Sequence, residues 1–136
     1  MSAATSGNST KRLILVTGAG RSGTSTIAGV FARLGFHVPL PVLQANESNP
    51  RGFYESWWPV KFHNRLTRRA GIELTDGQPN AGQLVTDALD EKARANLRTW
   101  LSEQLGDQDL VMVKDPRAAW VPALWSETAH ELGASI

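Results

Sequence analysis

The sequence contains no cysteine, which excludes disulfide bridges and metal sites built from thiolates. It also has no apolar run that approaches the roughly 18 residues of a membrane-spanning helix, so we expect no membrane insertion. Neither sign of charge dominates, because the formal net charge is only +1. Without a broad basic surface there is no electrostatic case for nucleic acid as a partner. These absences favour a soluble, cytoplasmic protein.

The chain is long enough for one domain with a single core, since 41% of its 136 residues are hydrophobic. Its first ten residues, MSAATSGNST, are small and polar and lack the apolar centre of a signal peptide. We therefore expect a disordered N-terminus at 1–10 and one folded unit at 11–136. The three histidines show no paired spacing, so we expect no metal site.

Strand and helix patterns alternate along the chain. Two short apolar runs, at 12–17 and 109–113, have the composition of buried strands. Apolar residues at helical spacing predict helices at 25–34, 59–70, 86–105 and 118–132. Segments rich in proline, asparagine and glycine, at 36–53 and 75–82, are expected to be irregular.

This order predicts an α/β fold in which helices flank a parallel sheet. Two strands are fewer than the roughly four to six of a usual sheet. The final residues, ELGASI, have the composition of a helix end that leads into another strand. We therefore expect the N-terminal part of a larger domain, truncated after its second strand.

The segment TGAGRSGTST, residues 17–26, follows the first expected strand and is rich in glycine. It fits the phosphate-loop pattern G-x-x-x-x-G-K-[ST], except that Thr24 replaces the lysine and the cation stands at Arg21. Losing that lysine removes the clamp for β and γ phosphates, which favours a less charged ligand without a metal. Glycine-rich turns before helices bind anions, so we expect ligand contacts from Gly20, Arg21, Ser22, Gly23, Thr24 and Ser25. The alternative is a glycine-rich turn without a ligand.

Three segments in order resemble one enzyme family. GAGRSGTS resembles the phosphosulfate-binding loop of sulfotransferases that use 3′-phosphoadenosine 5′-phosphosulfate (PAPS). NPRGFYES at 49–56 and VKDPR at 113–117 are similar to later segments of the bacterial members. The resemblance implies a P-loop-like parallel sheet and metal-free sulfuryl transfer from PAPS to a hydroxyl of a small molecule or glycolipid. Full-length members also carry an Arg and a Ser for the donor's 3′-phosphate, and nothing in this sequence corresponds to them.

The resemblance also implies catalytic roles. Arg21 would lie over the phosphosulfate bridge, where negative charge develops as the sulfuryl group leaves. Glu55 is the candidate general base, and the alternatives are that it caps the following helix or pairs with Arg51. Lys114 ends the second strand and is expected to contact the sulfuryl or bridging oxygens, unless it simply pairs with Asp115.

Three further residues are candidates for substrate binding. Arg117 would bind the donor or the acceptor, or would instead pack on Trp120. Trp57 offers an aromatic face that suits a sugar or a lipid, although tryptophans at helical spacing are more often core residues. His63 and His37 compete for the role of base, although a lone histidine on a helix more often serves packing.

Two other functions stay open. An apolar strand that ends near Asp115 resembles the Walker B element of a kinase or NTPase that uses Mg²⁺ and ATP. The lysine before Asp115, the proline after it and the threonine in the loop disfavour that function. A catalytically silent remnant that only binds anions is the second alternative. Dependence on Mg²⁺ would distinguish a kinase or NTPase from a sulfotransferase. Turnover would distinguish a sulfotransferase from the silent remnant.

Overall fold

The computed structural model describes residues 10–73, 75 and 77–136, and it has a mixed α/β fold. The segment predicted to be disordered, 1–10, lies outside the described residues except for Thr10. In chain order the described elements are β1 (Arg12–Val16), α1 (Thr24–Arg33), α2 (Trp57–Ala70), α3 (Ala81–Asp87), α4 (Glu91–Asp107), β2 (Leu110–Lys114), the 3₁₀ helix η1 (Pro116–Trp120) and α5 (Pro122–Glu131).

The sheet at the centre of the fold is parallel, as the sequence predicts. β1 and β2 pair so that Val16 lies opposite Lys114 at their carboxyl ends. On the outer edges, His37 forms a parallel bridge with β2 and Ser135 forms one with β1. The sequence predicts another strand after the last helix, and the described part of the chain has only the isolated bridge of Ser135 there. The pairing at His37 falls in a segment predicted to be irregular.

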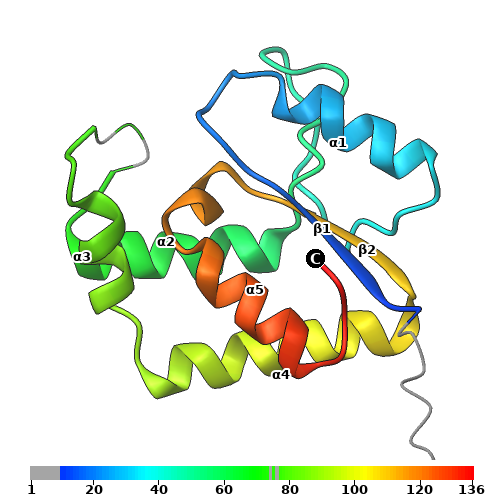
Figure 1. Ribbon diagram of the computed structural model, residues 1–136. Coiled ribbons are helices and arrows are strands. Elements are labelled where there is room, and N and C mark those ends of the chain that lie inside the picture. The colour runs from blue at the N-terminus through cyan, green and yellow to red at the C-terminus, as the bar shows by residue number, and fades with distance from the viewer. Residues whose placement is uncertain (1–9, 74, 76) are drawn as a thin grey trace, which may run out of the picture.

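The two faces of the sheet bury different cores because side chains alternate along a strand. Leu13 and Val111 belong to a large apolar cluster shared with α2, α4 and α5. Val16 and Met112 face the other way and pack with Ala28 of α1. Figure 1 shows the resulting layers, with α1 on one side of the strands and the remaining helices on the other.

Two helices predicted to be continuous are divided. The predicted helix at 86–105 is split into α3 and α4 at Asp90, whose Oδ1 accepts a hydrogen bond from the backbone N of Ala93 at 2.7 Å. This side-chain cap starts a new helix at that point. Pro122 divides the predicted helix at 118–132 into η1 and α5, because proline cannot donate a backbone hydrogen bond but suits a first helical position.

The other helix boundaries are close to the prediction. α2 begins at Trp57, two residues before the expected Pro59, and ends at Ala70, as predicted. Gly71 follows it, and its φ of 68° is the left-handed conformation of a helix stop. α3 was missed, because it begins at Ala81 inside a segment predicted to be irregular and overlaps the helix predicted from 86 only at its last two residues. Within the described part of the chain, no helix has the length and apolar content that a membrane crossing requires.

The segment between α1 and α2 folds back towards the carboxyl ends of the strands. Oδ1 of Asn46 organises its turn by accepting hydrogen bonds from Ser48 Oγ at 2.7 Å and from the backbone N of Asn49 at 3.0 Å. Tyr54 then packs on α1, where a Cβ atom at Gly29 would lie only 3.3 Å from the Tyr54 hydroxyl. The glycine in the helix therefore allows the segment to approach closely.

Candidate functional site

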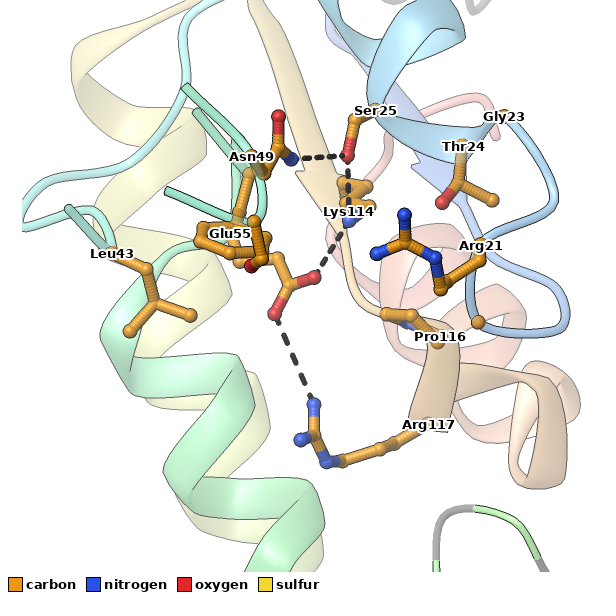
Figure 2. A pocket seen from close by; sticks show the side chains of 13 residues that line it. Arg21, Gly23, Thr24, Ser25, Leu43, Asn49, Glu55, Lys114, Pro116 and Arg117 are labelled. Atoms are coloured by element: carbon orange, nitrogen blue, oxygen red, sulfur yellow. Dashed lines mark hydrogen bonds and ion pairs between the residues drawn. The ribbon is translucent and has the colours of Figure 1, made fainter. Parts of the chain in front are cut away.

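A cavity of about 460 Å³ opens at the carboxyl ends of β1 and β2 (Figure 2). Loops converge there because parallel strands send their following segments to the same edge of a sheet. The cavity brings together many of the residues predicted to bind or react, namely Gly20, Arg21, Gly23, Thr24, Ser25, Glu55, Lys114 and Arg117. Residues from three separate segments of the chain thus line one space.

The glycine-rich loop forms one wall of the cavity. Gly23 has a φ of 88° and is the N-cap of α1, and among the described residues no side chain caps this helix end. Arg21 also adopts a left-handed φ, 61°, which is uncommon for a residue with a side chain and recurs at functional sites. Figure 2 shows the Arg21 side chain pointing from the loop towards Lys114 and Glu55. The loop therefore presents a cation and a helix N-terminus to the same space.

A buried ion pair joins Glu55 to Lys114. Lys114 Nζ donates to Glu55 Oε1 at 2.6 Å, and the two side chains are 3% and 9% exposed. Nζ of Lys114 also lies 3.3 Å from Ser25 Oγ on α1. On the other side of the carboxylate, Arg117 Nη1 lies 3.9 Å from Glu55 Oε2. The partners of Glu55 are thus Lys114 and Arg117, and the alternative pairing with Arg51 is not observed.

The charges in the cavity do not cancel. Arg21, Lys114 and Arg117 contribute three positive charges, against the carboxylate of Glu55 and that of Asp115, which pairs with Arg117 at 2.9 Å, so one positive charge is in excess. A recess with this excess attracts anions, and its walls strengthen the attraction by excluding water. An anion that enters the cavity would compete with Glu55 for Lys114. The carboxylate of Glu55 would then lie beside the bound anion.

Several lining residues were not predicted. Asn49 Nδ2 donates to Ser25 Oγ at 3.3 Å and so ties the segment before α2 to the first turn of α1. Asn49 is the first residue of the NPRGFYES segment, whose resemblance to sulfotransferases could have indicated it. No role for Asn49 was predicted from the sequence. Leu43 and Phe53 add apolar surface to the wall, and no pattern in the sequence distinguishes them from other apolar loop residues.

Ser22, Trp57 and His63 are the predicted site residues that lie outside the cavity. The hydroxyl of Ser22 donates to the backbone oxygen of Ala19 at 2.6 Å, within the loop. Trp57 is 40% exposed at the start of α2, and Lys61 Nζ lies 5.5 Å from the centre of its ring. His63 is only 1% exposed and lies in the interior. None of the three lines the cavity.

Other tryptophans pack on one another instead of lining the cavity. Trp58 stacks on Trp100 with ring centres 4.7 Å apart and on Phe62 with ring centres 5.1 Å apart. Trp100 in turn meets the fully buried Trp125 edge to face. These three tryptophans therefore serve packing, the usual role of tryptophans at helical spacing.

Asp115, directly after β2, is fully buried behind the cavity. Its Oδ2 lies 2.7 Å from His63 Nδ1, and its Oδ1 accepts hydrogen bonds from the backbone N and from Nη1 of Arg117 at 3.0 and 2.9 Å. Burial by itself raises the pKa of Asp115, but the hydrogen bonds from His63 and Arg117 outweigh it and hold the pKa below the ordinary 3.8.

This depressed pKa predicts a loss of stability in acid. A carboxyl whose pKa is lower in the folded chain than in the unfolded chain stabilises the fold above its unfolded pKa, about 3.9, and loses this contribution as the pH falls through the folded pKa. We expect the free energy of unfolding to fall more steeply below about pH 4 in the wild type than in Asp115→Asn. Urea unfolding at a series of pH values measures this slope. The exposed Asp107→Asn is the control that keeps the wild-type slope, and equal slopes for Asp115→Asn would contradict the prediction.

The candidate site is thus a cationic recess with one carboxylate. Among the described residues, no group of three or more histidine, aspartate or glutamate side chains is arranged to hold a metal ion. Comparisons of the chain with protein-family models, with curated proteins and with solved structures gave no match.

Proposed function

We propose that the cavity binds the phosphosulfate of PAPS and that the chain transfers its sulfuryl group to an acceptor hydroxyl. The observation that carries the proposal is a buried carboxylate, Glu55, inside a cationic recess beside a glycine-rich helix N-terminus. Arg21 and Lys114 offer two cations to the two negative charges of a phosphosulfate. The three motifs that resemble sulfotransferase segments all contribute residues to this one recess.

The reaction requires a base and stabilisation of the leaving group. The acceptor oxygen forms a bond to sulfur, the bond from sulfur to the bridging oxygen breaks, and the acceptor proton passes to Glu55. Arg21 and Lys114 stabilise the charge that develops on the departing phosphate. Lys114 is paired with Glu55 at 2.6 Å, so an anion that draws its Nζ away frees the carboxylate for the acceptor.

The contacts of Asp115 disfavour the rival function as a kinase or NTPase. Both of its carboxylate oxygens already accept hydrogen bonds from protein donors, His63 and Arg117. A Walker B aspartate needs an oxygen directed at Mg²⁺ or at its water. The Walker lysine, which reaches the β and γ phosphates, is replaced by Thr24.

Calorimetric titration of the full chain distinguishes the functions. The ligands are 3′-phosphoadenosine 5′-phosphate, which is the product of the donor, and ATP with Mg²⁺. We expect preferential binding of the bisphosphate without metal, followed by sulfuryl transfer when PAPS and hydroxyl acceptors are supplied. Binding of ATP that requires Mg²⁺ would support the kinase instead. A chain that binds the bisphosphate but transfers no sulfuryl group would be the silent remnant, and a folded chain that binds neither ligand would contradict the proposal.

Arg21→Ala tests the assignment of the loop. A charge-assisted hydrogen bond is worth about 1.5–3 kcal/mol, so its loss should weaken binding of the bisphosphate about 10- to 100-fold. Arg33→Ala is the matched control, because Arg33 is exposed at the other end of α1. Calorimetry gives both dissociation constants, and an Arg21→Ala chain with wild-type affinity would refute the role of the loop cation.

A further inference from the structure

Behind the cavity lies a set of buried polar side chains that the proposed reaction does not use. His63 of α2, Asp115 after β2 and Trp125 of α5 are 1%, 0% and 0% exposed. Trp125 Nε1 donates to His63 Nε2 at 3.0 Å, and His63 Nδ1 lies 2.7 Å from Asp115 Oδ2. Groups buried this deeply need satisfied hydrogen bonds, so the three residues depend on one another.

Trp125 determines the tautomer of His63. An indole N–H can only donate, so Nε2 of His63 must be the unprotonated acceptor. The hydrogen of the neutral ring is then on Nδ1, and Nδ1 donates it to Asp115. Of the three residues, Asp115 is therefore the charged one. His63 fixes its orientation, because both ring nitrogens of His63 already form hydrogen bonds, one with Asp115 and one with Trp125.

Arg117 connects these buried residues to the cavity. Asp115 Oδ1 accepts from both the backbone N and Nη1 of Arg117, which fixes the start and the end of that side chain. The same Nη1 lies 3.9 Å from Glu55 Oε2. Figure 2 shows Arg117 reaching the Glu55 carboxylate from below, while Lys114 approaches it from above. Because the guanidinium is planar and rigid, holding its end also sets its direction.

We propose that His63 and Asp115 are positioning residues that hold Arg117 against the candidate base Glu55. The inference rests on the proposed sulfuryl transfer. Oε1 of Glu55 is paired with Lys114, which an anionic donor draws towards itself, whereas Oε2 stays beside Arg117. Arg117 therefore keeps the carboxylate in place when Lys114 leaves it. Asp115 holds Arg117, and His63 orients Asp115.

Two substitutions at His63 test this role in the full chain. His63→Leu removes both nitrogens, and His63→Asn keeps an N–H donor near the place of Nδ1. We expect His63→Leu to lower kcat about 10- to 100-fold, the usual effect of losing a residue that orients a reacting group. The KM for PAPS and the affinity for the bisphosphate should change much less than kcat, because the loop with Arg21 is intact and Lys114 is kept. His63→Asn should recover most of kcat, and the exposed His130→Leu is the control without effect.

A second measurement does not depend on activity. The ¹⁵N NMR signal of the Arg117 side chain, assigned with Arg117→Lys, should be that of an ordered group in the wild type and in His63→Asn. In His63→Leu it should show motional averaging. A folded His63→Leu chain with wild-type kcat and an ordered Arg117 signal would overturn the inference while the proposed function stands.

The two proposals fail in different ways. A wild-type chain that neither binds the bisphosphate nor transfers a sulfuryl group overturns the proposed function, and with it the role of Arg117 at a base. The NMR signal then still decides whether His63 orders Arg117. If His63→Leu does not fold, Asp115→Asn takes its place, because it removes the charge that holds Arg117 and changes the shape of the side chain little. Unchanged kcat and an unchanged Arg117 signal in a folded Asp115→Asn chain would overturn the positioning role.

Discussion

Replacing Glu55 with glutamine is expected to lower turnover about 10²- to 10⁴-fold, the usual contribution of a general base. The amide cannot take the proton of the acceptor, although its shape and its contact surface are nearly those of the carboxylate. Affinity for 3′-phosphoadenosine 5′-phosphate should rise rather than fall, because Lys114 no longer has a carboxylate partner at 2.6 Å that competes with the ligand. Steady-state kinetics and calorimetry measure the two effects separately.

The same substitution at Glu47 is the matched control. Glu47 is exposed in the same segment between α1 and α2 and is not among the residues that line the cavity. Its replacement by glutamine should change neither turnover nor affinity. A Glu55→Gln chain with wild-type turnover would end the candidacy of Glu55 as the base. Weaker binding of the bisphosphate would contradict the competition between Glu55 and the ligand for Lys114.

Replacing Lys114 with methionine is expected to lower the free energy of unfolding by about 3 kcal/mol. Removing one member of a buried ion pair leaves the other charge uncompensated, at a typical cost of about 3–5 kcal/mol. The lower end applies here because Arg117 lies 3.9 Å from the remaining carboxylate. The bisphosphate should also bind much more weakly, since one of the cations of the cavity is lost. Urea unfolding at neutral pH and calorimetry measure the two losses.

The double substitution Lys114→Met with Glu55→Gln separates these causes. It removes both charges, so most of the lost stability should return, whereas binding of the bisphosphate should stay weak. Lys92→Met, an exposed lysine on α4, is the control and should stay within about 0.5 kcal/mol of the wild type. If the double variant were no more stable than Lys114→Met alone, Glu55 and Lys114 would not be coupled.

The central fold was predictable because its signals are local. Apolar runs bounded by glycine or polar residues indicated both strands, and the helix stop at Gly71 was correctly expected. The break between α3 and α4 was missed although Asp90 is a favourable helix cap, because the apolar spacing continues across it. The pairing of His37 was missed because a single bridge leaves no periodic pattern in a sequence.

The candidate site was predictable as a set of residues but not as a set of contacts. Motif resemblance indicated Glu55 and Lys114 separately, 59 positions apart in the chain. Their ion pair depends on where the segment before α2 crosses the end of β2. His63 was expected to bind substrate, but the burial of its helix face directs it to Asp115 and Trp125 instead.

The sequence alone determined which segments can form buried strands, where glycine permits a left-handed turn in the loop after β1, and which side chains carry charge. These properties belong to single residues and their near neighbours. The tertiary structure alone decided which charges meet, because Lys114 has Glu55 rather than the adjacent Asp115 as its partner. Side chains alternate along a strand and its extension, so neighbouring residues face opposite ways and partners come from distant segments.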